Sequence, residues 1–340
     1  MERRETRKVL VGDVPIGGGE AISVQSMTKT RTEDTRATVD QIRRLELAGC
    51  EIVRVAVPDS EAASALKEIR TAISIPLVAD IHFHYKLALE AIQAGADKLR
   101  INPGNIGAKW KVEEIVRAAR ERKIPLRIGV NAGSLWGSPR KKHRGAGAQA
   151  LVESASRCAA ILEDLDFHDV VVSLKSSDIP TTIRAYQLMS GQNDYPLHLG
   201  VTEAGLPLPG SVRSAVGIGS LLSQGIGDTL RVSLTGDPVM EVEAGFEILK
   251  SLGLREHGPT VIACPTCGRS EVDLISLAEE VERRVRSMRK PLKIAVMGCV
   301  VNGPGEAQEA DVGIAGGKGA GLVFRRGEVV RKVGEESLVE

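Results

Sequence analysis

Three cysteines and one glutamate near the end of the chain form the most reactive set of side chains in the sequence. Cys264 and Cys267 lie in the segment CPTCGR, and Cys299 lies in MGCVVNGPGE, which ends in Glu306. Thiolates are the ligands that iron–sulfur clusters and zinc prefer. Three thiolates leave a tetrahedral or cubane metal one ligand short, so the last position is open to a weak ligand or a substrate. The pattern predicts a redox or Lewis-acid enzyme.

Iron–sulfur chemistry fits this ligand set better than zinc does. A closed structural zinc site needs a fourth Cys or His. His257 is the nearby histidine, but it lies on the linker side of the motif, and Glu306 is a hard oxygen donor. The remaining cysteines, Cys50 and Cys158, fall at a helix end and within a helix, where we interpret them as small buried apolar residues.

A second set of candidate residues consists of cations that fall within or at the end of short apolar runs. An unpaired buried charge costs several kcal/mol. If these cations meet at one place, a multiply charged anion such as phosphate or diphosphate explains them, because Arg binds phosphate bidentately. The alternative is a set of structural ion pairs, for which the nearby acids Asp80 and Glu203 are too few. The cations are Arg54, Arg100, Arg127, Lys175 and Arg231.

Other polar residues end the same runs. Asn131, Thr202, Glu203 and Ser233 are candidates for contacts with such an anion, and His82 is either a catalytic or a supporting residue. The segment GSPRKKHRGAG, which starts at Gly137, is basic and glycine-rich. It fits either a lid over an anionic substrate or a solvated loop.

The elements that must position these residues follow one repeating theme from residue 21 to about residue 250. Eight short β-branched runs alternate with helix-length segments, which is the size and rhythm of a (β/α)8 barrel of the TIM type. An open doubly wound sheet is the alternative, although no G-x-G-x-x-G follows the first run. The eight runs begin at Ala21, Glu51, Pro76, Asp97, Pro125, Asp169, Pro196 and Asp228.

Two further segments complete the predicted architecture. RKVLVGDVPIGGG, near the N-terminus, predicts a hairpin that turns at Gly12 and Asp13 and plugs the barrel floor. A small α+β domain follows the barrel and ends in a second hairpin. We therefore predict a substrate diphosphate-binding barrel over residues 1–253 and a cluster-binding domain over residues 254–340.

Composition excludes several classes of protein. The chain has 340 residues, 45 basic and 44 acidic, with a net charge of +1, which argues against bulk electrostatic binding to nucleic acid or an anionic membrane. No apolar run is long enough for a transmembrane helix, and the N-terminus lacks the apolar core of a signal peptide. Five cysteines in such a chain are expected to be reduced or to bind metal. The cytoplasm is the expected location.

Four motifs together resemble one known family. CPTCGR, MGCVVNGPGE, VQSMT with the following T-x-D-T, and ADIHF are similar to segments of the 4-hydroxy-3-methylbut-2-enyl diphosphate synthases (IspG, also called GcpE). The resemblance covers essentially the whole chain, in the bacterial two-domain form without the middle domain of plant members.

The resemblance implies reductive ring opening and dehydration of 2-C-methyl-D-erythritol 2,4-cyclodiphosphate in the methylerythritol phosphate route to isoprenoids. Two electrons would arrive from flavodoxin or ferredoxin through a 4Fe–4S cluster. Cys264, Cys267 and Cys299 would ligate three irons, and Glu306 would ligate the fourth, with Asn302 beside the cluster. The five cations, with Asn131, Glu203 and Ser233, match the family's diphosphate-binding set, and Glu203 is a candidate proton carrier.

The resemblance also implies a head-to-tail homodimer in which each cluster domain caps the partner's barrel. Two alternatives of other classes remain at this point. One is a zinc-stabilised barrel transferase of the pterin-synthase type, acting on phosphorylated substrates. The other is a nucleic-acid-binding protein with a zinc ribbon, against which the low aromatic content of 3% counts.

Overall fold

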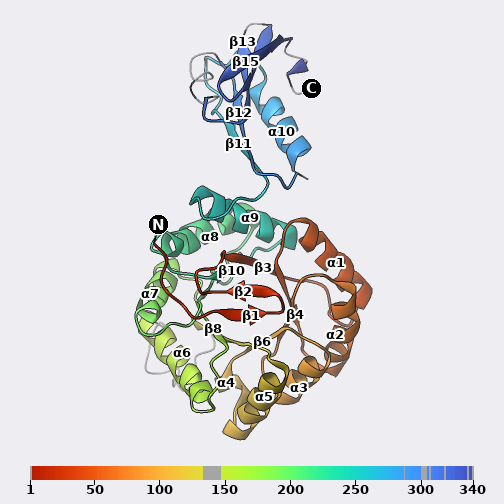
Figure 1. Ribbon diagram of the computed structural model, residues 1–340, viewed down its shortest axis with the longest axis vertical. Coiled ribbons are helices and arrows are strands. Elements are labelled where there is room, and N and C mark those ends of the chain that lie inside the picture. Colours follow the sequence, from red (N-terminus) through yellow and green to blue (C-terminus); the bar gives the residue numbers. More distant parts are fainter. Residues whose placement is uncertain are drawn as a thin grey trace. The chain divides into compact units, whose positions relative to one another are not determined.

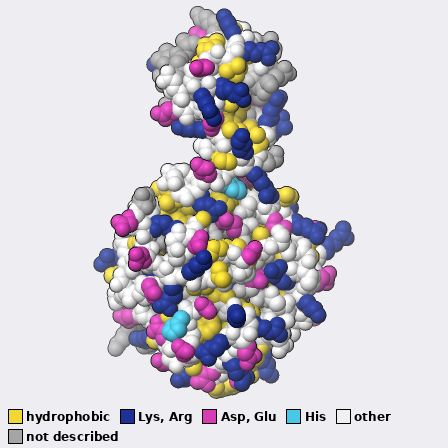
Figure 2. Space-filling model, in the orientation of Figure 1, with side chains coloured by type: hydrophobic (Ala, Val, Ile, Leu, Met, Phe, Trp, Pro, Cys, Tyr) yellow, Lys and Arg dark blue, Asp and Glu magenta, His cyan; other side chains and the backbone are white. Residues whose placement is uncertain are grey.

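The chain folds into two compact units, Met1–Arg255 and Glu256–Glu340, which divide close to the predicted boundary. The computed structural model describes residues 2–132, 147–286, 288–299, 305, 308–317, 319–334 and 337–338. Within these ranges, no helix combines the length and apolar character needed to cross a bilayer. Basic and acidic side chains are interspersed on the face shown in Figure 2, as the balanced composition predicts.

The first unit is a parallel barrel of eight strands (Figure 1). Neighbouring strands pair from β8 through β3 to β10 and β9, and a bridge between Val172 and Leu197 joins the two ends. The predicted (β/α)8 barrel is confirmed, and an open sheet is wrong. The barrel strands are β3 (Ser23–Met27), β4 (Ile52–Ala56), β5 (Leu77–Asp80), β6 (Lys98–Ile101), β7 (Leu126–Asn131), β8 (Val170–Lys175), β9 (His198–Leu199) and β10 (Thr229–Leu230).

Each predicted run contains one of these strands, but β9 and β10 are much shorter than the runs. The ladder continues locally past them, because the Arg231 N–H still donates to the Leu199 carbonyl at 3.0 Å. Side chains alternate along every strand between the barrel interior and the layer of helices outside. On β6, Leu99 and Ile101 pack in the outer apolar core, so Lys98 and Arg100 face the interior.

Helices surround the barrel because their apolar faces pack on the outward side chains of the strands. Aspartates that accept an N–H of the first turn cap several of them, including Asp178 and Asp237. Gly49, which follows the end of the first helix, has φ of 95°, which favours glycine. The helices are α1 (Thr35–Leu47), α2 (Ser60–Ala72), α3 (Tyr85–Gln93), α4 (Pro103–Ile106), α5 (Lys109–Arg122), α6 (Ala148–Glu163), α7 (Ile179–Ser190), α8 (Pro207–Leu222) and α9 (Pro238–Ser251).

The predicted N-terminal hairpin forms from β1 (Val9–Val11) and β2 (Val14–Ile16). It crosses the barrel in Figure 1. Its apolar side chains cluster with Ile52, Val78 and Val171, which point inward from three barrel strands. These three residues lie near the starts of their strands, so the hairpin closes the N-terminal end of the barrel, as predicted.

The second unit contains a five-stranded mixed sheet, against which the helix α10 packs. The predicted terminal hairpin is confirmed. The elements are β11 (Pro259–Ala263), α10 (Leu274–Val285), β12 (Leu292–Met297), β13 (Val312–Gly317), β14 (Ala320–Arg325) and β15 (Glu328–Val333).

Candidate functional site

The predicted cations do meet inside the C-terminal half of the barrel. Arg54, Arg100, Arg127 and Lys175 lie on β4, β6, β7 and β8 and are all buried, and Arg127 is only 1% exposed. Arg231 follows β10 and is nearly as buried. Burial lowers the pKa of Arg54 to about 10, even though Asp80 opposes that shift. The free energy of folding therefore carries the cost of placing these charges out of water.

Two of the cations share a single acceptor. Arg100 Nη1 donates to Asp80 Oδ1 at 3.0 Å, and Arg54 Nε lies 3.6 Å from the other oxygen. Burial alone would raise the pKa of Asp80, but Arg54, the His82 hydrogen bond and Arg100 together hold it well below its usual range. Asp80 is thus an anion that orients both guanidinium groups. His82 is half exposed and contacts the same oxygen and Arg100, which fits a supporting role.

Glu241 is a site residue that the sequence did not reveal. It is fully buried in the first turn of α9, accepts from Arg231 Nη2 at 3.1 Å and lies 3.2 Å from Lys29 Nζ. Ser26 Oγ also donates to it at 3.0 Å. The expectation that nearby acids are too few must therefore be corrected for Arg231, which has a full ion-pair partner. In the sequence, Glu241 resembles any acidic residue in a first helical turn.

Among the residues that the structure describes, Arg127 and Lys175 have no acidic partner of this kind. Nε and Nη1 of Arg127 are inaccessible to solvent and make no hydrogen bond within the part of the chain that the structure describes. Burial, followed by repulsion from Arg127, Arg54 and the other cations, lowers the pKa of Lys175 well below its usual value. Among the described residues, the five cations therefore lie near two buried acids, Asp80 and Glu241. The excess positive charge is typical of an anion-binding site.

Two glycines make room for these cations. A Cβ at Gly129 would lie 2.5 Å from Arg100 Nε, and a Cβ at Gly200 would lie 2.5 Å from Lys175 Nζ. Any larger residue would displace a cation from the barrel mouth. Sequence reasoning missed both, because a glycine within a strand indicates only that something approaches closely.

The candidates other than the five cations lie at the same end of the barrel. Asn131 ends β7 opposite Lys175 on β8, and Ser233 is half buried beyond β10. Glu203, which follows β9, is exposed and has φ of 53°, so its backbone is in the left-handed region. Among the described residues, Glu203 makes no ion pair with the five cations. Most of the basic segment after β7 lies outside the described residues.

The thiols lie at the corresponding end of the second sheet. Cys264 directly follows β11, and Cys299 comes two residues after the parallel strand β12. The Gly298 N–H donates to Cys264 Sγ at 3.3 Å, and the Glu271 N–H donates to the Gly298 carbonyl at 3.0 Å. Hydrogen bonds therefore hold the two cysteine loops side by side.

Backbone amides also favour the thiolate form. The N–H of Arg269 lowers the pKa of Cys267, which is exposed. An N–H aimed at sulfur is a common feature of iron–sulfur sites. Asn302 and Glu306 lie outside the described residues, and within the described part no three candidate ligands are close enough to hold a metal ion. The donor types and their loops fit a thiolate-bound cluster.

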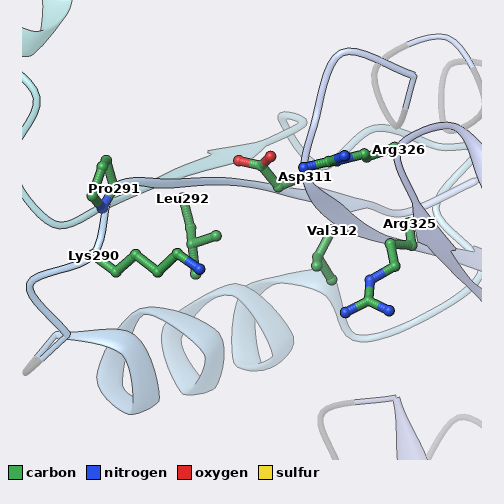
Figure 3. A pocket seen from close by; sticks show the side chains of 7 residues that line it. All are labelled: Lys290, Pro291, Leu292, Asp311, Val312, Arg325 and Arg326. Carbon is green, nitrogen blue, oxygen red and sulfur yellow. The ribbon is translucent and has the colours of Figure 1, made fainter.

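The other two cysteines are structural, as expected. Cys50 and Cys158 are buried, and burial raises their pKa to about 12 and about 11. A groove in the second unit is also separate from the thiols (Figure 3). Its lining includes Leu292 and Val312, which start β12 and β13, and Arg325, which ends β14, whereas the thiols follow the ends of β11 and β12.

Comparison with known proteins gives the same division of the chain. The GcpE TIM-barrel domain matches residues 6–246, and the GcpE protein C-terminal domain matches residues 260–340. The chain belongs to the GcpE family. A relative from Clostridium perfringens is 58% identical over 340 residues, covering 100% of this chain and 97% of its own. A relative from Symbiobacterium thermophilum is 59% identical, covering 100% and 92%. Both are named 4-hydroxy-3-methylbut-2-en-1-yl diphosphate synthase (flavodoxin).

Two solved structures are similar in fold to about 73% of this chain. Dihydropteroate synthase from Stenotrophomonas maltophilia has a TM-score of 0.52 at 14% identity, covering 73% of this chain and 98% of its own. A type I 3-dehydroquinate dehydratase from Clostridium difficile gives the same values. Identities this low show only the fold, so the pterin-synthase alternative gains nothing further from them. The predicted family is confirmed, and with it the assignment of the chain to the oxidoreductases of isoprenoid biosynthesis.

Proposed function

We propose that this chain opens the ring of 2-C-methyl-D-erythritol 2,4-cyclodiphosphate reductively and releases water to give 4-hydroxy-3-methylbut-2-enyl diphosphate. The observation that carries the proposal is the buried guanidinium of Arg127, two of whose nitrogens lack a hydrogen-bond partner in the described part of the chain, beside Lys175 and three other cations. A diphosphate supplies the negative charge and the acceptor oxygens that these donors lack. The names of the full-length relatives agree with it.

The residues of the barrel act on the diphosphate. Arg54, Arg100, Arg127, Lys175 and Arg231 hold its oxygens, while Asp80 and Glu241 fix the orientation of three guanidinium groups. When the ring opens, the bond from carbon to a phosphate oxygen breaks and that oxygen gains charge. Donors that are already in place stabilise such charge without reorganising. Asn131 and Ser233 contribute neutral hydrogen bonds at the rim.

The second unit is proposed to hold a 4Fe–4S cluster through Cys264, Cys267, Cys299 and Glu306, with Asn302 beside it. The cluster supplies two low-potential electrons, received singly from flavodoxin or ferredoxin, together with an iron that can act as a Lewis acid. Glu203 delivers a proton to the hydroxyl that leaves as water. The enzyme works in the cytoplasm as a homodimer in which each cluster-bearing unit caps the partner's barrel.

Anaerobic purification followed by iron, sulfide and turnover measurements tests this proposal. About four irons and four sulfides per chain, with a dithionite-reducible spectrum and conversion of the cyclodiphosphate, are expected. Stoichiometric zinc without sulfide would contradict the redox function. A loaded cluster without turnover, in the presence of reduced flavodoxin, would contradict the substrate assignment instead.

A further inference from the structure

Beneath the cations of the mouth lies a second polar layer that neither the sequence motifs nor the expected substrate contacts include. We call Gln25, Lys98 and His198 the inner layer. Each of the three side chains is fully buried, with no exposed surface. Lys98 lies two residues before Arg100 on β6, so both side chains face the barrel interior. Lys98 also pairs with Val78, which packs on the N-terminal hairpin, so the layer lies between the apolar floor and the mouth.

The polar atoms of the inner layer are unsatisfied. Lys98 Nζ, both ring nitrogens of His198 and both amide atoms of Gln25 are inaccessible to solvent. None of them has a hydrogen-bond partner among the residues that the structure describes. Buried polar groups in native proteins are usually paired, and each exception calls for an explanation. Five such atoms on three strands of one barrel indicate that the inner layer gains hydrogen bonds only when another part of the site changes.

The charged residues around the inner layer indicate what that change is. Toward the inner layer, β4 presents Arg54, β6 presents Arg100, β7 presents Arg127 and β8 presents Lys175, while β5 contributes Asp80. Arg231, which follows β10, is paired with Glu241. Ser23 and Gln25 on β3 are uncharged, and the floor is apolar. Burial, followed by Arg127 and Arg54, lowers the pKa of Lys98 well below its usual value. Burial, followed by Arg127, Lys175 and Lys98, does the same to the pKa of His198. In the free barrel, burial and the nearby cations therefore both disfavour the charged forms of Lys98 and His198.

We propose that Lys98 and His198 take up protons from solvent when a diphosphate binds at the mouth, so that substrate binding is coupled to net proton uptake. This inference rests on the proposed function. The bound anion offsets the repulsion from Arg54, Arg127 and Lys175 and favours the charged forms below it. The Lys98 amine becomes an ammonium with three donors, and the imidazole becomes a double donor, which strengthens the hold on the anion. Lys98 and His198 are thus binding determinants of the barrel.

Isothermal titration of methylerythritol cyclodiphosphate into the cluster-loaded protein, without reductant, tests the coupling. Each phosphorus of this ligand carries one strongly acidic hydroxyl, so the ligand itself does not bind protons near neutral pH. The binding enthalpy measured in buffers of different ionisation enthalpy gives the number of protons exchanged. We expect an uptake of about one to two protons, since two groups titrate. The dissociation constant should rise about tenfold per pH unit for each proton taken up.

Two variants test whether Lys98 and His198 are the groups that take up these protons. Lys98→Met keeps the length of the side chain but removes the amine; it should lower the uptake by about one proton and weaken binding. Its ligand-free Tm should rise, because an unsatisfied buried amine is removed. His198→Gln tests the second group in the same way, and Lys67→Met, an exposed lysine on α2, is the matched control.

The outcomes separate the inference from the function on which it rests. If the wild-type protein does not bind the cyclodiphosphate, the proposed function fails. If it binds with an enthalpy that does not depend on the buffer, the proton coupling is wrong. If Lys98→Met and His198→Gln both keep the full uptake and affinity, the protons belong to other groups and the role of the inner layer is refuted.

Discussion

Replacing Gly200 with alanine should disable the diphosphate site without touching a charged residue. The new Cβ would lie 2.5 Å from Lys175 Nζ and 2.7 Å from the Arg231 carbonyl oxygen. The ammonium can swing away, but the carbonyl belongs to the backbone and cannot move cheaply. Overpacking of this kind costs about 1–3 kcal/mol of stability. At about 2–4 °C per kcal/mol for a unit of this size, Tm should fall by about 2–12 °C.

The effect on binding follows from the displaced lysine. A hydrogen bond to a charged group contributes about 1.5–3 kcal/mol, so losing the Lys175 contact should weaken cyclodiphosphate binding by about 10- to 150-fold. Calorimetric titration gives the affinity, and differential scanning calorimetry gives Tm. Gly219→Ala on α8 is the control, because its Cβ would meet nothing within 4 Å. A Gly200→Ala protein with wild-type affinity and Tm would refute the argument that this glycine makes room for Lys175.

Three further changes test the charge balance and the assembly. Asp80→Asn leaves the buried Arg54 and Arg100 without their shared anion, so it should lower the free energy of unfolding in chemical denaturation by about 3–5 kcal/mol. Because the pKa of Asp80 is depressed in the folded protein, the stabilisation from its carboxylate is present above the unfolded pKa and is lost as pH falls through the folded pKa. Arg127→Met should raise the Tm of the free protein yet abolish binding, and a lowered Tm would show that Arg127 is structurally paired. Mixed Cys299→Ala and Arg127→Ala chains should regain activity through hybrid dimers, and hybrids that form but stay inactive would refute the shared site.

The alternation of eight short β-branched runs with helix-length segments was sufficient to predict the barrel from the sequence. Each run supplies one side of the strand to the helices and the other to the interior, and this alternation is visible in residues such as Leu99 and Ile101. The second sheet was harder, because β13 consists mostly of glycine and small residues, whose β propensity is low. The site cations were predictable for a related reason, since charges in apolar runs need an explanation.

The sequence could not show which acid pairs with which cation. Glu241 reaches Arg231 from a helix that follows its strand, and only the packing of α9 against the barrel brings them together. Lys98 and Arg100 have the same pattern in the sequence, yet one pairs with Asp80 and the other pairs with nothing in the described structure. Partner choice inside a barrel depends on the shear between strands, which local patterns do not encode.

The N-terminal hairpin has a consequence for how the protein is made. The segment that leads into it is fixed by residues far along the chain: Arg7 pairs with Asp194, and Thr6 donates to Asp228. During synthesis at about 5–20 residues per second, these first residues leave the ribosome about 10–40 seconds before their partners. Throughout that interval the apolar side chains of Val9, Val11 and Ile16 have no barrel to enter. We expect the nascent chain to need protection there, and chains that end before the barrel unit is complete at Arg255 to be cleaved by proteases at the N-terminus.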